Sequence, residues 1–462
     1  MKTKKIYFLL MVCALFTMPF TSCSDKNDEL LTPANAVSNL SFADKDEEAG
    51  KIGGTLTWKL PFIEMNIDEY VIYLSATATE RGTQIGTAPH GTISFTIPDG
   101  TAFNNYLIVI AKNAAGESTN WASIAVTDKT PEVPEPHTPE TIGLFILNKG
   151  NWGENNASIS FYNFADKTVI ADIYKIVNGS GLGDTAEQML IYGSKVYVTV
   201  TGSNRLVVLD QTGTLIKSIE PKKDGAPQSP RALTADGGKV YVSYYDSHTV
   251  AALDTASLNI TGEIAVGRYP EQLTVTGGKL YVANSGGGDF ETGYAKTVSV
   301  IDIATFKVEK EIEVIINPTQ IVADSQGDLY VVSMGNYGDV PATLQRIDAK
   351  TGAVSTLGNA TTITLVNDKL YAMDAPWGAT NIQYKKYNVL TEKVESEKFI
   401  TDGTSIGAPG KVAVDPLTEK IYITESPYGS TGTIYAFTAD GKLEYKFDTG
   451  GYDVGAIQFI VQ

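Results

Sequence analysis

Cysteine, histidine and arginine are scarce in this sequence of 462 residues, which has two, three and five of them. A protein metal site needs clustered Cys, His or carboxylate ligands, and His90, His137 and His248 are far apart in the chain. Asp246 and His248 lie two residues apart, but no nucleophile motif accompanies them. The sequence therefore predicts no metal site, no cofactor and no enzymatic activity.

Basic residues are also outnumbered, since 36 Lys and Arg face 53 Asp and Glu and the formal net charge is −17. An acidic surface repels phosphate backbones, so we expect no nucleic-acid partner. A local positive patch can still oppose the global charge.

The first 23 residues have the pattern of an export signal rather than of a folded domain. Basic residues in Met1–Lys5 precede an apolar run, Tyr7–Phe20, that is too short to span a membrane. The run ends before Cys23 in a motif that resembles a bacterial lipobox, and the acidic segment Ser24–Glu29 resembles a surface-export signal. We expect a signal peptide over 1–22, lipidation of Cys23, a tether over 23–32 and a lipid-anchored protein of the outer membrane, exposed at the cell surface. An ordinary secretory signal, or an anchor facing the periplasm, is the alternative.

Residues 33–128 alternate apolar and polar positions in short runs, as a small β-sandwich does. Turn residues separate the runs, notably Pro98–Gly100. Trp58 on an early strand, Tyr70 on the next and Asn113–Gly116 after a late strand make this region similar to fibronectin type III domains. Four prolines within residues 129–140 predict an extended linker.

One phrase recurs along the last two-thirds of the chain: an apolar strand, a turn and a second strand that carries an aromatic residue. Successive copies are 40 to 52 residues apart. This period, built of strands and turns, is typical of propeller blades. The seven aromatic anchors are Phe145, Tyr197, Tyr241, Tyr281, Tyr330, Tyr371 and Tyr422.

The two ends of this repeat region complement each other. Phe145 lacks the inner strand that precedes every other anchor, and Val454–Ile460 is such a strand with no anchor after it. We therefore expect an all-β protein: an Ig/fibronectin III-like sandwich followed by a seven-bladed β-propeller over 141–462, closed by its last strand. Aspartates after the third strands, such as Asp210 and Asp302, suit tight turns.

The repeat region resembles the YncE-like seven-bladed propellers, and most of all the surface lipoproteins of gut commensals that carry such a propeller beside outer-membrane transporters. Asn148–Ser160 is the most distinctive matching segment. The resemblance implies that the protein binds a corrinoid or a ferric siderophore and passes it to a TonB-dependent transporter.

One propeller face carries the loops between second and third strands together with the starts of the inner strands. These loops are rich in aromatics beside Gly and Asn, which suits exposed turns with large contact surfaces. Three of the five arginines fall on the same face, in blades two to four, which suggests a bulky anionic ligand. The candidate ligand-binding residues are Trp152, Arg205, Arg231, Tyr244, Tyr245, His248, Arg268, Tyr269, Phe290, Tyr337, Trp377 and Tyr428.

We therefore expect a surface lipoprotein that captures a bulky metal-chelate nutrient on this face and delivers it to a TonB-dependent transporter. An aromatic platform with arginines favours a ferric catecholate siderophore. A corrinoid such as vitamin B12 is the alternative ligand. An adhesion or scaffold propeller without a small ligand is the alternative function, and there the aromatics would form a protein-docking patch.

Overall fold

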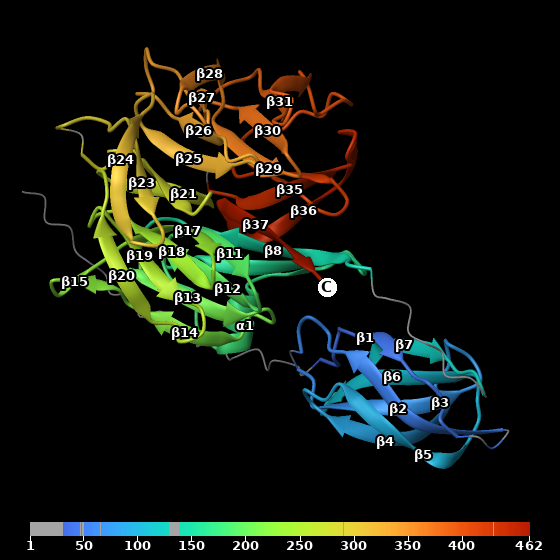
Figure 1. The fold of residues 1–462 in the computed structure, drawn as a ribbon. Helices are drawn as coiled ribbons and strands as arrows, with labels where there is room; N and C mark the ends of the chain where they lie inside the picture. Colours follow the sequence, from blue (N-terminus) through green and yellow to red (C-terminus); the bar gives the residue numbers. More distant parts are fainter. Residues whose placement is uncertain are drawn as a thin grey trace, which may run out of the picture. The chain divides into compact units, whose positions relative to one another are not determined.

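The computed structural model describes residues 31–46, 48, 50–64, 66–128, 138–289, 291–427 and 429–462. The chain forms two compact units, Met1–Pro134 and Glu135–Gln462. Both are built of strands, and the described residues contain one short helix, α1 (Ile173–Asn178) (Figure 1). No helix in this part of the chain has the length and apolar character needed to cross a membrane. The expected signal peptide, Cys23, most of the tether and most of the linker at 129–140 lie outside the described residues.

The first unit is the expected sandwich of two antiparallel sheets, in the order β1-β2-β5 and β4-β3-β6-β7. Its strands are β1 (Ser38–Ser41), β2 (Lys51–Lys59), β3 (Glu69–Ser75), β4 (Thr83–Pro89), β5 (Ser94–Ala102), β6 (Tyr106–Asn113) and β7 (Gly116–Ala125). The prediction of a turn at Pro98–Gly100 was wrong: these residues lie inside β5, opposite a register shift between Ile52 and Gly54 of β2. Pro98 is accommodated because a bulge interrupts the ladder at this point.

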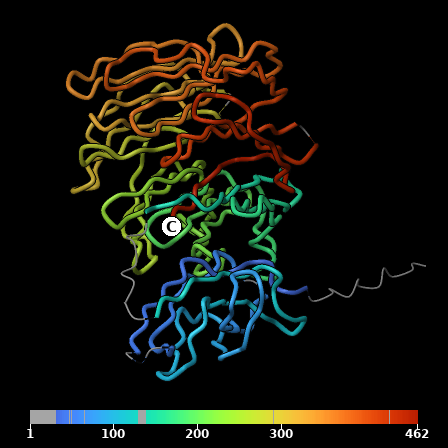
Figure 2. The backbone as a smooth tube through the Cα atoms, turned by 90° about the vertical axis from the view of Figure 1, so that its right-hand side faces the viewer, coloured from blue at the N-terminus to red at the C-terminus, as the bar shows by residue number. Residues whose placement is uncertain are grey.

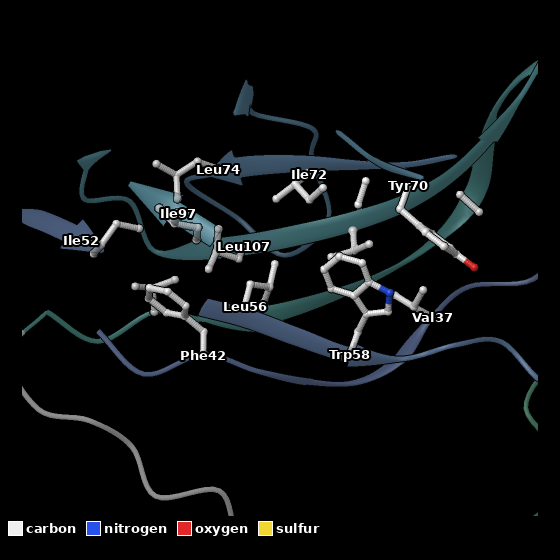
Figure 3. Packing of buried hydrophobic residues seen from close by; sticks show 14 of the residues in the cluster. Val37, Phe42, Ile52, Leu56, Trp58, Tyr70, Ile72, Leu74, Ile97 and Leu107 are labelled. Atoms are coloured by element: carbon white, nitrogen blue, oxygen red, sulfur yellow. The ribbon is translucent and has the colours of Figure 1, made fainter. Parts of the chain in front are cut away.

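The sandwich core lies between the two sheets. Trp58 of β2 and Tyr70 of β3 face each other there, with ring centroids 5.8 Å apart (Figure 3). Leu56, Ile72 and Leu107 are fully buried beside them. This inner layer explains the Trp and Tyr that the sequence pattern singled out, because aromatic pairs contribute large buried areas to small cores.

The second unit consists of seven four-stranded antiparallel sheets arranged as propeller blades (Figures 1 and 2). From the inner to the outer strand they are β37 (Val454–Val461), β8 (Thr141–Asn148), β9 (Ser158–Asn163) and β10 (Val169–Ile170); β11 (Ala186–Tyr192), β12 (Lys195–Val200), β13 (Arg205–Asp210) and β14 (Leu215–Ile219); β17 (Pro230–Asp236), β18 (Lys239–Tyr244), β19 (Thr249–Asp254) and β20 (Ile260–Ala265); β21 (Pro270–Thr276), β22 (Lys279–Asn284), β23 (Thr297–Asp302) and β24 (Lys307–Glu313); β25 (Pro318–Ala323), β26 (Leu329–Ser333), β27 (Thr343–Ile347) and β28 (Val354–Gly358); β29 (Thr362–Val366), β30 (Lys369–Asp374), β31 (Gln383–Asn388) and β32 (Lys393–Ser396); β33 (Pro409–Val414), β34 (Ile421–Glu425), β35 (Thr431–Phe437) and β36 (Leu443–Tyr452). A small hairpin, β15 (Lys222–Lys223) and β16 (Ala226–Pro227), precedes the third blade.

The last strand closes the ring as predicted. β37 pairs antiparallel with β8, and Ile457 lies opposite Ile146. The end of the described chain therefore completes the first blade, which removes a free strand edge at the axis.

The aromatic anchors lie on the second strand of each blade and pack between blades. Six are buried, and Tyr281 is half-buried. The predicted aspartate turns are also confirmed, since Asp210 and Asp302 accept hydrogen bonds from the backbone N–H groups of Thr212 and Thr305.

Glutamines on three inner strands join neighbouring blades. The Oε1 atoms of Gln188, Gln272 and Gln320 accept hydrogen bonds from backbone N–H groups of the next inner strand. The three distances are 2.6 Å to Leu233, 2.9 Å to Ile321 and 3.0 Å to Ile363. We call these glutamines the inter-blade staples. They pair backbone groups that antiparallel ladders within each blade leave free.

Candidate functional site

A cavity of about 660 Å³ lies on the propeller axis. Its wall is made by all seven inner strands, and its mouth by the loops between second and third strands, through Tyr245, Gly287, Tyr294, Met334 and Tyr337. The cavity therefore opens on the face that the sequence pattern singled out. Its volume is in the range of small-molecule sites.

Charged side chains gather in this cavity on adjacent blades. We call Lys149, Glu187, Arg231, Glu271 and Lys411 the axial charge cluster, and all five line the cavity. Arg231 Nη1 lies 2.7 Å from Glu187 Oε1, while its Nε and Nη2 lie 2.7 and 3.2 Å from the two carboxylate oxygens of Glu271. Lys149 Nζ is 3.4 Å from Glu187 and 3.2 Å from Asp453. Arg231 is thus held on both sides by carboxylates.

The two glutamates differ in their electrostatic surroundings. Burial alone would raise the pKa of Glu187, but Arg231, Lys149 and Lys411 outweigh it and lower that pKa. Glu271 has Arg231 as its close cationic partner, so burial dominates and its pKa is raised. Burial lowers the pKa of Lys411, and nearby Lys149 lowers it further. Clusters of shifted groups in a cavity are typical of functional sites.

Exposed aromatics surround the mouth of the cavity. Trp152, Tyr337 and Trp377 have 78%, 72% and 97% of their surface exposed, and they belong to the loops β8–β9, β26–β27 and β30–β31. Among the described residues these are the exposed aromatic side chains, and all three lie on the same propeller face. We call them the rim aromatics. Tyr337 also lines the cavity and packs edge-on against Tyr294, with centroids 6.2 Å apart.

A second aromatic group runs from the cavity to the third and fourth blades. The Arg231 guanidinium lies 5.1 Å from the ring centre of Tyr245, Tyr245 contacts Tyr269 at 4.9 Å, and Tyr269 contacts His248 at 4.5 Å. Burial raises the pKa of Tyr245 to about 12. A side chain at Gly288 would place Cβ 2.2 Å from the Tyr269 ring, so this glycine permits close packing.

The structure therefore brings Arg231, Tyr245, His248 and Tyr269 together, but it alters the interpretation of other candidates. Tyr244 is fully buried in the core of the third blade, because it ends β18 with its side chain directed away from the face. It does not belong to a ligand-contacting surface.

The prediction of a positive arginine cluster was also wrong, because each arginine already has a partner in the chain. Arg205 donates to the carbonyl oxygen of Leu182. Arg268 binds Asp289 at 2.8 Å and the carbonyl oxygen of Gly293 at 2.9 Å. With Arg231 between two glutamates, none of the three offers an uncompensated charge. Phe290 and Tyr428 lie outside the described residues.

Sequence reasoning missed Glu187 and Glu271. A signal was present: Glu187, Arg231 and Glu271 each stand ten residues before the tyrosine anchor of their blade. Equal offsets in successive blades place side chains at equal heights on neighbouring inner strands, where opposite charges pair. In the described part of the chain, no group of three or more His, Cys, Asp or Glu side chains is arranged to hold a metal ion.

Fold and site together define a seven-bladed β-propeller with a polar axial cavity, preceded by a β-sandwich. The chain belongs to the DUF5074 family, described as a domain of unknown function, whose model matches residues 142–453. No curated protein matches this chain.

Solved structures support the fold. A quinoprotein alcohol dehydrogenase-like protein from Bacteroides thetaiotaomicron is 17% identical, with a TM-score of 0.50, and the match covers 94% of this chain and 98% of that one. A candidate 6-phosphogluconolactonase from Bacteroides fragilis is 12% identical, with a TM-score of 0.51 and coverage of 69% and 98%. A similar protein from Bacteroides uniformis is 13% identical, with a TM-score of 0.50 and coverage of 69% and 99%. At these identities the likeness concerns the fold alone.

Proposed function

We propose that the propeller captures a bulky small molecule at the mouth of its axial cavity, without transforming it. One observation carries this proposal: the rim aromatics stand on the loops of the face into which the cavity opens. Exposed tryptophans are costly for a soluble surface and supply large, rigid contact areas to a ligand. In our proposal the chain is a lipid-anchored protein of the outer membrane, attached through Cys23, that delivers its ligand to a TonB-dependent transporter.

The ligand class we propose is a metal-chelate nutrient. The preference for a ferric catecholate siderophore depended on free arginines, and Arg205, Arg231 and Arg268 are all paired within the chain. A polyanionic chelate would have to compete with those partners. A corrinoid relies more on aromatic contact and neutral hydrogen bonds, so it is now the better supported ligand, and the siderophore is second.

A docking function is the second candidate, and one observation favours it. Trp152 and Trp377 are highly exposed but do not line the cavity. Aromatics in such positions serve as anchors in protein interfaces. In this case the face would bind a surface protein, and no small ligand would be needed.

Isothermal titration of the chain from residue 24 onward, with cyanocobalamin and with ferric enterobactin, tests the proposal. We expect Trp377→Ala to weaken binding of the true ligand about tenfold, because a central aromatic contact is lost. The matched control is Leu390→Ala, which removes an exposed side chain from the turn between β31 and β32, on the opposite face of the same blade.

Absence of binding to both chelates would contradict the capture proposal and support docking. Hydrolysis of 6-phosphogluconolactone by the purified chain would contradict the proposal that the protein is not an enzyme.

A further inference from the structure

Lys411 occupies a position where three other blades carry an inter-blade staple. In the second and seventh blades the equivalence is visible in the backbone, since the N–H groups of Gln188 and Lys411 donate to the hydroxyl groups of Thr199 and Thr424, at 3.0 and 2.8 Å. A lysine has no acceptor oxygen, so it cannot bind the backbone N–H of the next blade as glutamine does. The seventh blade therefore places a cation in the cavity instead of a staple.

The ammonium group of Lys411 has no ion pair or hydrogen bond with any described residue. The other cations of the axial charge cluster do: Lys149 has Glu187 and Asp453, and Arg231 has Glu187 and Glu271. The Lys411 side chain is accessible from the cavity. The charged groups that act on it are Lys149, Glu187, Asp453 and Arg231. An accessible cation surrounded by the inner strands is an anion-binding group with an unused valence.

The rest of the cavity suits an organic anion. Its lining includes three cations and two carboxylates, which leaves one positive charge in excess. Thr319, Thr361, Thr362 and Thr364 add hydroxyl groups from the fifth and sixth blades, and Tyr245, Tyr294 and Tyr337 provide aromatic surface at the mouth. One excess charge matches one acidic group rather than a polyanion.

We propose that Lys411 binds a single anionic group, a carboxylate or a phosphate, of the molecule that enters the axial cavity, while the tyrosines at the mouth contact its apolar part. This inference rests on the proposed function of ligand capture and names the chemistry of the captured molecule.

The test titrates the full chain with 2-naphthoate, 2-naphthyl phosphate and the neutral 2-naphthamide. The variant is Lys411→Gln, because glutamine already stands at this position in three blades and is compatible with the fold. We expect the preferred aryl anion to bind the wild type, and Lys411→Gln to weaken it roughly ten- to a hundredfold, as for a lost charged hydrogen bond. Lys393→Gln, on the exposed outer strand β32, is the control and should bind as the wild type does.

The two aryl anions distinguish a carboxylate site from a phosphate site, and the amide should bind no better to the wild type than to Lys411→Gln. Equal binding of the anions by wild type and Lys411→Gln, or no binding of either anion, would overturn the inference. A drop in the melting temperature of Lys411→Gln would also contradict it, since that result indicates a structural role for the lysine.

The titrations with metal chelates keep this result separate from the proposed function. Lys411-dependent binding of an aryl anion without chelate binding would refute the chelate proposal and support the anion site. Chelate binding that is unchanged in Lys411→Gln would support capture and refute the anion site.

Discussion

Replacing Arg231 by methionine tests whether the axial charge cluster is a stabilising network. The change removes the guanidinium but keeps a side chain of comparable length. Glu187 retains Lys149 at 3.4 Å, so the stranded group is Glu271, whose side chain is 13% exposed. Breaking a buried pair in this way costs about 3–5 kcal/mol.

This cost translates into a measurable shift of the melting temperature. For a unit that spans Glu135–Gln462, the entropy of unfolding is about 0.7 kcal/mol/K, so Tm should fall by about 4–7 °C. Differential scanning calorimetry of the full chain measures it. Lys296→Met is the control: it breaks an exposed pair with Glu313, 2.7 Å long, and should shift Tm by less than about 1 °C.

Two further measurements make the reasoning refutable. In the Arg231→Met background, Glu271→Gln should restore at least half of the lost Tm, because it removes the stranded charge. The pKa of Glu271 is already raised in the folded protein, and loss of Arg231 raises it further. A carboxyl group whose folded pKa is raised costs stability as pH increases above its unfolded value. The deficit should therefore be smaller at pH 5 than at pH 8. An unchanged Tm, or a deficit that grows on acidification, would refute a buried charge network.

Two other predictions concern the inner strands. Gln272→Leu leaves the backbone N–H of Ile321 without its acceptor and should cost about 1–3 kcal/mol, or about 1–4 °C in Tm; a shift below 0.5 °C in calorimetry would contradict a stapling role. Lys411→Gln should raise Tm at pH 7, because the folded pKa of Lys411 lies below its ordinary value and its charge therefore opposes folding. This gain should shrink as pH rises from the folded pKa towards the ordinary value of 10.5, where lysine is neutral in both states, and a gain that increases with pH in thermal melts would contradict the sign.

The blade architecture was predictable because it repeats. Tyr197, Tyr241 and Tyr422 recur with the same neighbours, and one period specifies a strand position in every blade. Ring closure was predictable for a related reason, since Val454–Ile460 is an inner strand that no anchor follows. Pro98–Gly100 was misread because local turn propensity is overridden where a bulge accommodates the proline.

The state of each charge at the site was not predictable from composition. Arg231 looked like a free cation until Glu187 and Glu271, 44 and 40 residues away, were placed on the adjacent strands. Tyr244 fell in a loop by its sequence position, but strand β18 extends to include it and turns it into the core. The rim aromatics were predictable, since Trp152 and Trp377 lie beside glycines in turns and have no strand pattern to bury them.

The pairing of β37 with β8 has a consequence for biosynthesis. Blade one begins the propeller but takes its inner strand from residues 454–461, so six blades are translated before the first can be finished. During that time the unpaired edge of β8, with Leu144 and Ile146, is a template for any passing strand. A ribosome that stalls within the last blade would therefore release a chain whose first blade is the aggregation-prone one. Quality-control factors that act on such products should encounter the beginning of the propeller, not its unfinished end.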